Sequence, residues 1–209
     1  MKRRGYLIVI EGVDGSGKTT QAKMLTEYLK KRGYPVILLK EPTDGPKGKL
    51  IRLRLENGNV NQFELMRLYA EDRYENVINN IKPALNEGKI VIVDRYVPSS
   101  LVYQSINGPT IEEILEANSF APIPDIVIII DIPEDEAVKR MLSENKKQDA
   151  FERKEFLKKV REKYLTLPEE LKKFSEWANT KFIIVNGLRK QEEVFQDIKK
   201  AVDELLGGQ

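Results

Sequence analysis

Short apolar runs alternate with longer amphipathic segments along the chain. Each run is rich in valine and isoleucine and apolar on both faces, which is typical of buried parallel strands. We expect strands at Leu7–Ile10, Val36–Lys40, Ile90–Asp94, Ile126–Asp131 and Phe182–Val185. The intervening segments predict helices at Lys18–Lys31, Asn61–Glu87 (with Pro83 kinking it or marking its last turns), Pro133–Leu142, Phe151–Thr166, Pro168–Ala178 and Gln191–Leu205. This alternation predicts a three-layer α/β domain with right-handed crossovers.

The pattern continues without a linker, an internal repeat or a low-complexity tract, so we expect one domain over residues 1–209. Hydrophobic residues make up 41% of the chain and charged residues 33%, which is typical of a folded protein in water. The formal charge of +2 predicts neither a nucleic-acid partner nor a membrane partner. No apolar run is long enough to cross a bilayer or to form a signal peptide. We therefore expect a cytoplasmic protein.

The first apolar run leads into a glycine-rich loop that fits the pattern G-x-x-x-x-G-K-[ST]. Its glycines let backbone N–H groups converge on an anion, and the following helix directs its positive N-terminus at the same place. Lys18 adds a mobile charge for the β- and γ-phosphates, and the Thr19 hydroxyl is placed to hold Mg²⁺. The loop predicts binding of a nucleoside triphosphate. We expect the contacts to come from Gly12, Val13, Asp14, Gly15, Ser16, Gly17, Lys18, Thr19 and Thr20.

Two of the predicted strands end in an aspartate, at the edge of the sheet where ligands of parallel α/β proteins bind. Asp94 is followed directly by Arg95, which places a metal-side anion and a phosphate-side cation at one strand end. We expect this pair to be functional rather than a structural ion pair. Asp131 comes shortly before Pro133 at the start of the next helix, and a structural role in the loop or cap is favoured for it.

Tyr69 and Arg73 are four residues apart and therefore lie on one face of a predicted helix. Such a pair could stack on a flat base and donate a hydrogen bond to its carbonyl edge. From spacing alone the favoured alternative is that Tyr69 joins Leu65 and Leu68 in the core while Arg73 is solvated.

The segment from Met141 to Arg153 is charged, and its beginning has little periodicity. It is consistent with a mobile flap over bound phosphates, and equally with a solvated run of charges. Asn145-Lys146 resembles the start of the guanine-binding motif of GTPases, but Asp149 falls one place late and no strand leads into the segment, which argues against a GTPase. The chain contains no histidine, so catalysis must proceed without the usual proton carrier at neutral pH.

Four motifs occur in a fixed order along the chain. They are Val9-Ile-Glu-Gly-Val-Asp-Gly-Ser-Gly-Lys-Thr-Thr-Gln21, Lys40-Glu-Pro-Thr43, Leu68-Tyr-Ala-Glu-Asp-Arg73 and Asp94-Arg-Tyr-Val-Pro-Ser-Ser-Leu-Val-Tyr-Gln104. Their order and spacing resemble the thymidylate kinase family over nearly the whole chain. The resemblance implies a P-loop NTPase fold with a five-stranded parallel sheet, a flexible lid over residues 143–153 and a homodimer packed through helices. It also implies phosphoryl transfer from Mg-ATP to dTMP.

The resemblance assigns roles to single residues as well. Asp14 would bind the deoxyribose 3′-hydroxyl, Arg95 the acceptor phosphate, and Asp94 the water shell of Mg²⁺. Tyr69 would stack on thymine and Arg73 would donate to its O4, which reverses the interpretation favoured by spacing. The remaining assignments are Ser99 and Gln104 to the side of the base, Tyr103 to the sugar 2′ position, Arg140 to adenine, and Asn186 with Gly187 to the loop that closes over adenine.

The sequence departs from the family pattern in the lid, where Ala150 stands in place of an expected catalytic arginine. The remaining lid cations are Lys146, Lys147 and Arg153, and we expect one of them to act on the transferring phosphoryl group together with Lys18 and Arg95. Two other functions stay open. One is a different nucleoside monophosphate or small-molecule kinase of this architecture. The other is a P-loop ATPase or nucleotide-binding regulator that acts on a protein or a nucleic acid.

Overall fold

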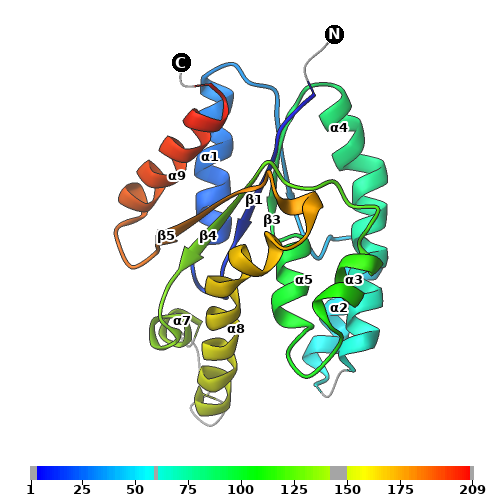
Figure 1. Cartoon of the computed structure of the whole chain (residues 1–209). Helices are drawn as coiled ribbons and strands as arrows, with labels where there is room; N and C mark the ends of the chain where they lie inside the picture. Colours follow the sequence, from blue (N-terminus) through cyan, green and yellow to red (C-terminus); the bar gives the residue numbers. More distant parts are fainter. Residues whose placement is uncertain (1–3, 59–60, 142–149, 208–209) are drawn as a thin grey trace.

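The structure is a computed structural model that describes residues 4–58, 61–141 and 150–207 (Figure 1). The strands of the described residues are β1 (Leu7–Glu11), β2 (Val36–Lys40), β3 (Ile90–Asp94), β4 (Ile126–Asp131) and β5 (Lys181–Asn186). The helices are α1 (Lys18–Lys31), α2 (Pro46–Glu56), α3 (Gln62–Asn76), the π-helix η1 (Val77–Ile81), α4 (Lys82–Asn86), α5 (Val97–Tyr103), α6 (Ile111–Ala117), α7 (Glu134–Met141), α8 (Ala150–Leu171), the 3₁₀-helix η2 (Ser175–Trp177) and α9 (Gln191–Leu205).

The strands form one parallel sheet in the order β2-β3-β1-β4-β5, which confirms the expected five-stranded α/β architecture. Strand β1 lies at the centre, with Ile10 paired to Asp94 of β3 and Glu11 paired to Ile129 of β4. The carboxyl ends of β1, β3 and β4 therefore meet where the glycine-rich loop begins. This register brings the loop and the acidic strand end together.

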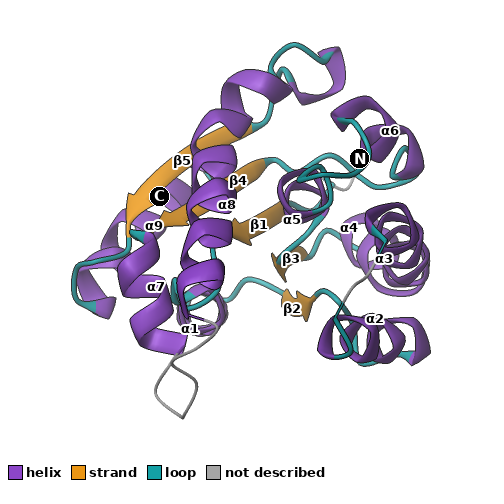
Figure 2. Ribbon diagram, turned by 90° about the horizontal axis from the view of Figure 1, so that it is seen from below, coloured by secondary structure: helices purple, strands orange, loops and turns teal. Residues whose placement is uncertain are grey.

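Alternate residues of the buried strands face two separate apolar clusters. Ile8 and Ile10 face the side covered by α1 and α9, while Leu7 and Val9 face the side covered by α4, α5 and α8 (Figure 2). Since the central strands are buried on both faces, they read as continuous apolar runs in the sequence. None of the helices in the described part of the chain is long and apolar enough to cross a membrane.

The helices differ from the sequence-based expectation at five places. The segment expected as one helix over Asn61–Glu87 is divided into α3, η1 and α4, and Pro83, which has no N–H to continue the helical ladder, lies in the first turn of α4. Two helices were expected at Phe151–Thr166 and Pro168–Ala178. The first of these segments and the beginning of the second form the single helix α8, which continues through Pro168 and ends at Leu171, and the rest of the second contains η2. Helices α2, α5 and α6 were not predicted. The last two are only seven residues each, which is too short for a clear period.

Candidate active site

The glycine-rich loop joins β1 to the N-terminus of α1 at the centre of the sheet edge. Gly12, Gly15 and Gly17 have positive φ values of 141°, 79° and 95°, and a side chain at Gly12 would lie 2.5 Å from the carbonyl oxygen of Ile130. Gly17 caps α1 without a side-chain hydrogen bond, so the N–H groups of the first turn have no side chain that caps them. The loop thus has the backbone geometry of an anion site.

Lys18 folds back over the loop and is almost completely buried, with its ammonium group donating a 2.8 Å hydrogen bond to the carbonyl oxygen of Val13. Burial and the nearby Arg95 cation lower the pKa of Lys18 to about 7, against the opposing effect of Asp14 and Asp94. The ammonium is therefore held close to the backbone of the glycine-rich loop, in surroundings that make its charged form less favourable than it is in water.

Thr19 and Asp94 meet beside the loop. The Thr19 hydroxyl donates a 2.5 Å hydrogen bond to Oδ2 of Asp94, which is 3% exposed. The second carboxylate oxygen, Oδ1, is buried and has no hydrogen-bond partner among the described residues. Both residues line a cavity of about 620 Å³ together with Lys23 and Lys40. A buried carboxylate oxygen beside a hydroxyl is the kind of oxygen set that fits Mg²⁺ or its water shell.

A second cavity of about 450 Å³ adjoins the first one and lies between the ends of β2 and β3 and the helices α2, α3, α5 and α8. The structure places all the residues expected at the acceptor nucleotide on its wall: Asp14, Tyr69, Arg73, Arg95, Ser99, Tyr103 and Gln104. Its other walls include Lys40, Arg52 and Phe156, to which the sequence analysis assigned no role. The sequence-separated candidates therefore share one pocket.

Arg95 connects this cavity to the glycine-rich loop. Its backbone is in the left-handed region with φ of 72°, a rare conformation for a residue other than glycine that is often found at functional sites. The guanidinium pairs with Asp14 through Nη2 and lies over the Tyr103 ring at 5.2 Å. Burial acts to raise the pKa of Asp14, but the cations of Arg95 and Lys18 hold this pKa below its ordinary value. Asp14 therefore stays ionised at neutral pH.

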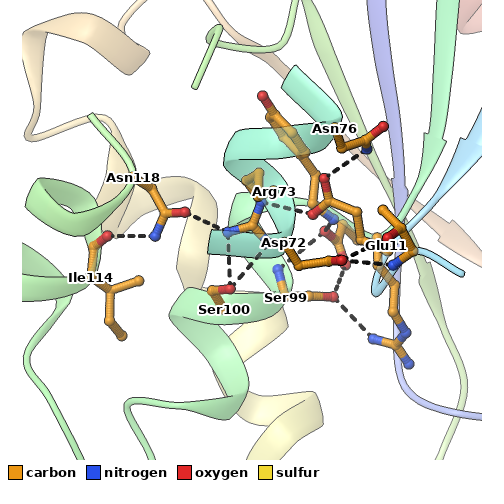
Figure 3. A network of polar contacts seen from close by, with 12 residues as sticks. Glu11, Asp72, Arg73, Asn76, Ser99, Ser100, Ile114 and Asn118 are labelled. Atoms are coloured by element: carbon orange, nitrogen blue, oxygen red, sulfur yellow. Dashed lines mark hydrogen bonds and ion pairs between the residues drawn. The ribbon is translucent and has the colours of Figure 1, made fainter. Parts of the chain in front are cut away.

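Arg73 is 1% exposed, so the alternative in which it is solvated is wrong. Its Nε donates to Glu41 at 2.7 Å, and Nη1 donates to Asn118 at 2.5 Å and to Ser100 at 3.2 Å (Figure 3). Asn76 donates to the other oxygen of Glu41. Burial raises the pKa of Glu41 above its ordinary value, although the Arg73 cation acts in the opposite direction. These contacts fix the guanidinium between the end of β2, α5 and the end of α6.

Tyr69 lies one turn before Arg73 on α3. Its ring packs against the buried cluster of Ile51, Leu65 and Leu68 and also lines the acceptor cavity. The interpretation of Tyr69 as a residue packed against Leu65 and Leu68 is therefore correct, and Tyr69 also lines the second cavity. Both interpretations of this residue describe part of its environment.

The residues expected at the donor base lie at the opposite side of the loop. Arg140 of α7 donates through Nη1 to the carbonyl oxygen of Gly15 and through Nη2 to that of Gly187, both at 3.2 Å. Glu136 orients the same guanidinium through Nε. Asn186 ends β5, and its side-chain oxygen accepts a hydrogen bond from the N–H of Leu188. These contacts join the phosphate loop to the loop that follows β5.

Asp131 has the structural role that the sequence analysis favoured. Arg161 of α8 binds it through two hydrogen bonds, at 2.7 and 3.0 Å, and also lies 3.5 Å from Glu134. A carboxylate with such a bidentate partner is not available to a metal in this arrangement. Of the two aspartates at strand ends, only Asp94 therefore faces the phosphate loop with an unpaired oxygen.

The expected lid is described only at its end. Lys146 and Lys147 lie outside the described residues, as do Asp149 and the side chain of Ala150. Arg153 lies near the beginning of α8 with an exposed side chain, and its charge contributes to the lowered pKa of Asp14.

Two buried glutamates in the site were missed in the sequence. Glu11 ends β1 and Glu41 follows β2, and both are at most 2% exposed. The rule that selected Asp94, a carboxylate at the end of a predicted strand, applies to Glu11 and Glu41 as well. Tyr164, which contacts Glu11, had no comparable signal, because an aromatic at helical spacing is most often a core residue.

Comparison with known proteins gives one consistent result. A family model described as thymidylate kinase matches residues 10–198. A probable thymidylate kinase of Pyrococcus abyssi is 43% identical over 98% of this chain and 99% of its own length, and one of Pyrococcus horikoshii is 44% identical with the same coverage. A thymidylate kinase of Caldanaerobacter subterraneus is 42% identical over 98% of both chains. With the glycine-rich loop, the Asp94–Arg95 strand end and the shared acceptor cavity in place, this chain belongs to the thymidylate kinase family.

Proposed function

We propose that this protein phosphorylates dTMP to dTDP with Mg-ATP as the phosphate donor. The observation that carries the proposal is the pair of adjoining cavities beside the glycine-rich loop, which share Lys40, Pro42 and Arg52 as lining residues. Thr19 and Asp94 line one cavity, and Arg95 and Asp14 line the other. A phosphate chain held on the loop therefore has its terminal phosphoryl group between a metal-binding pair and an arginine that can hold a second phosphate. This is the arrangement that transfer between two nucleotides needs.

On the donor side, the loop N–H groups and the N-terminus of α1 bind the phosphates, and the Lys18 ammonium neutralises charge on the β- and γ-phosphates. Arg140 offers a guanidinium plane for the adenine ring, and its three hydrogen bonds keep that plane in place. Asn186 and Gly187 border the same position from the end of β5. The remaining loop residues supply backbone contacts.

Mg²⁺ bound at Thr19 and Asp94 would supply positive charge to the phosphate oxygens during transfer. The fit rests on the unpaired buried Oδ1 of Asp94 and on the hydroxyl next to Oδ2. An oxygen this deeply buried and without a partner is costly unless a ligand or an ordered water satisfies it.

On the acceptor side, Arg95 holds the dTMP phosphate and Asp14 accepts a hydrogen bond from the 3′-hydroxyl of the sugar. Their ion pair places both groups at the mouth of the same cavity. Tyr103 lies against Arg95 and limits the space at the 2′ position, which favours deoxyribose. Tyr69 provides an aromatic face for the base, and Ser99 lines the wall beside it.

Two polar groups in this cavity can distinguish thymine from cytosine. Gln104 is 3% exposed, and its side-chain oxygen is buried without a hydrogen-bond partner in the described structure. Arg73 has one N–H on Nη2 beyond those that its described contacts use. An acceptor and a donor on one wall complement the N3–H and O4 of thymine, whereas cytosine presents the opposite pair at these positions.

Catalysis of this transfer needs no histidine, because the acceptor oxygen is already ionised at neutral pH. The protein contributes alignment and positive charge from Lys18 and Arg95, with one of the lid cations Lys146, Lys147 and Arg153 completing the set. Exclusion of water from the site limits hydrolysis of ATP.

We also propose a homodimer packed through the α3 side of the molecule. Phe63 and Tyr74 lie on α3 and Ile78 on η1, and their side chains are 46%, 52% and 42% exposed. Large apolar side chains exposed on one part of a folded protein are typical of an interaction face. Sedimentation analysis of wild-type protein and of Tyr74→Lys tests this, since the charge should shift the protein towards monomer.

The direct test of function is steady-state kinetics with a panel of nucleoside monophosphates at fixed Mg-ATP, followed by release of ADP. We expect dTMP to be the best acceptor, dUMP to be weaker and dCMP to be poorest among the pyrimidines. A preference for a purine monophosphate would favour a different monophosphate kinase of this architecture. ATP hydrolysis stimulated by nucleic acid and independent of dTMP would favour an ATPase instead.

A further inference from the structure

Glu11, at the carboxyl end of β1, is completely buried below the phosphate loop. Its Oε1 accepts hydrogen bonds from the backbone N–H groups of Tyr96 (2.9 Å) and Ser99 (3.1 Å). Its Oε2 accepts from the Ser99 hydroxyl at 2.6 Å and from the Tyr164 hydroxyl at 2.8 Å (Figure 3 shows Glu11 and Ser99). Four donors around one carboxylate fix the positions of both hydroxyl groups.

The same two hydroxyls face Arg95. Nη1 of Arg95 lies 3.0 Å from the Ser99 hydroxyl and 3.4 Å from the Tyr164 hydroxyl, and the two hydroxyls are 3.0 Å apart. Because each hydroxyl directs its proton to Oε2 of Glu11, its lone pairs remain to accept from Nη1. Burial and the Glu11 carboxylate raise the pKa of Tyr164 well above its usual value, so this hydroxyl keeps its proton at any pH where the enzyme works.

The other end of the Arg95 guanidinium is less constrained. Nη2 pairs with Asp14, whose side chain is about half exposed, and lies 3.4 Å from the Tyr103 hydroxyl. The Tyr103 ring is itself packed between two aromatics of α8, with centroid distances of 6.1 Å to Phe156 and 6.3 Å to Tyr164. One helix thus supports both the buried edge of Arg95 and the ring over which its guanidinium lies.

We propose that Tyr164 is a positioning residue for the acceptor phosphate. Together with Ser99 it holds Nη1 of Arg95 in place, so that the guanidinium is aligned before dTMP binds. The inference rests on the proposed role of Arg95. Pre-alignment reduces the conformational entropy that Arg95 loses on binding phosphate, and that saving appears in the affinity for dTMP rather than for ATP.

A residue that only satisfied the Glu11 carboxylate would behave differently. Its loss would lower the melting temperature and would reduce activity whether or not Arg95 were present. A positioning residue acts through Arg95, so its effect must disappear when the guanidinium is removed.

The experiment is a double-mutant cycle of Tyr164→Phe and Arg95→Ala, with Tyr28→Phe as the matched control. Tyr28 also donates its hydroxyl to a carboxylate, the partly exposed one of Asp203, but it lies on α1 and lines neither cavity. KM for dTMP, KM for ATP, kcat and the melting temperature are measured for each variant. Ser99→Ala, alone and with Arg95→Ala, is carried as the second variant in case Tyr164→Phe does not fold.

We expect Tyr164→Phe to raise KM for dTMP roughly three- to tenfold, as the loss of one hydrogen bond in a pre-aligned site should. KM for ATP should change less than about twofold. In the Arg95→Ala background the additional substitution should leave KM for dTMP unchanged, and Ser99→Ala should follow the same pattern. Tyr28→Phe should have no effect on either KM.

Two results would overturn the inference while leaving the proposed function intact. One is an unchanged KM for dTMP in folded Tyr164→Phe, and the other is an equal effect of this substitution with and without Arg95. If Arg95→Ala alone leaves KM for dTMP unchanged, the proposed role of Arg95 is wrong, and the inference about Tyr164 is wrong with it.

Discussion

Thr19 and Asp94, which are 75 residues apart in sequence, are joined by a 2.5 Å hydrogen bond from the threonine hydroxyl to Oδ2 of the aspartate. Oδ1 stays buried beside the first cavity, without a hydrogen-bond partner among the described residues. The relationship follows directly from the sheet, because the register of β1 against β3 pairs Ile10 with Asp94 just before the phosphate loop. The proposed metal site therefore depends on strand order as much as on the loop motif.

Asp94→Asn should raise the Mg²⁺ concentration needed for half-maximal activity by roughly 10- to 100-fold, because the amide keeps the shape of the side chain but loses its charge. Activity is measured over a Mg²⁺ titration at saturating ATP and dTMP. Asp131→Asn is the matched control, since this second strand-end aspartate is bound by Arg161 and should change stability without changing the Mg²⁺ requirement. An unchanged Mg²⁺ titration for Asp94→Asn would remove Asp94 from the metal site.

Binding of ATP should be accompanied by uptake of a proton at Lys18. The pKa of this lysine is lowered to about 7 in the free protein, and an adjacent polyphosphate raises it. At about pH 8 the free protein holds Lys18 mostly neutral and the complex holds it charged, so a proton is taken up. At about pH 6 Lys18 is already charged in both states, and the uptake should vanish.

Calorimetry of ATP binding in buffers with different ionisation enthalpies measures this proton directly. Lys18→Met should abolish the uptake, and the exposed Lys30→Met on the same helix should preserve it. The same proton uptake in Lys18→Met and in the wild type would show that another group takes up the proton.

Gln104→Leu should lower kcat/KM for dTMP by roughly tenfold, because the apolar side chain removes the acceptor for N3–H and leaves this donor unpaired. The loss for dCMP should be smaller, since unprotonated N3 of cytosine gains nothing from an acceptor. The ratio of the two kcat/KM values is the measured quantity. Gln62→Leu serves as the control on the wall of the same cavity, where no buried unpaired oxygen is lost. An unaltered ratio in Gln104→Leu would count against base recognition by this residue.

The parts of the molecule that sequence could predict are those whose signal is local. The central strands were found because burial on both faces makes them continuous apolar runs, and the phosphate loop because its residues are consecutive. Helix α6 was missed because it is short, although its capping box, with Thr110 and Glu113 bonded to each other's backbone, was readable in the sequence.

The buried networks of the site were not predictable in the same way. Glu11, Ser99 and Tyr164 come from β1, α5 and α8, and only the crossovers between these elements bring their side chains together. For Arg73, helical spacing showed which face it shares with Tyr69, but not that Glu41 and Asn118 bury that face. Such contacts depend on how elements that are distant in sequence pack together, and residue spacing within one element does not predict that packing.

Glu41→Ala should lower the free energy of unfolding by about 3–5 kcal/mol, because it leaves the Arg73 guanidinium buried without its counter-charge. The pair is almost wholly buried, with side chains 1% and 2% exposed and a separation of 2.7 Å. Chemical denaturation of the variant measures the change. Asp44→Ala breaks the ion pair of Arg52 with a fully exposed carboxylate and should leave the unfolding free energy nearly unchanged. Equal stability of Glu41→Ala and the wild type would mean that Arg73 finds another partner.

A cation of the lid is expected to compensate for Ala150, which stands in place of an arginine. We expect one of the single variants Lys146→Ala, Lys147→Ala and Arg153→Ala to lose roughly 100-fold in kcat with little change in either KM, since the missing charge acts on the transferring phosphoryl group. Arg153 is the described candidate, and its charge already acts on Asp14 at the acceptor site. Lys158→Ala, on the exposed side of α8, is the control for loss of one positive charge. Three mild effects would show that no lid residue performs this task and that Lys18 and Arg95 carry the charge of the transition state alone.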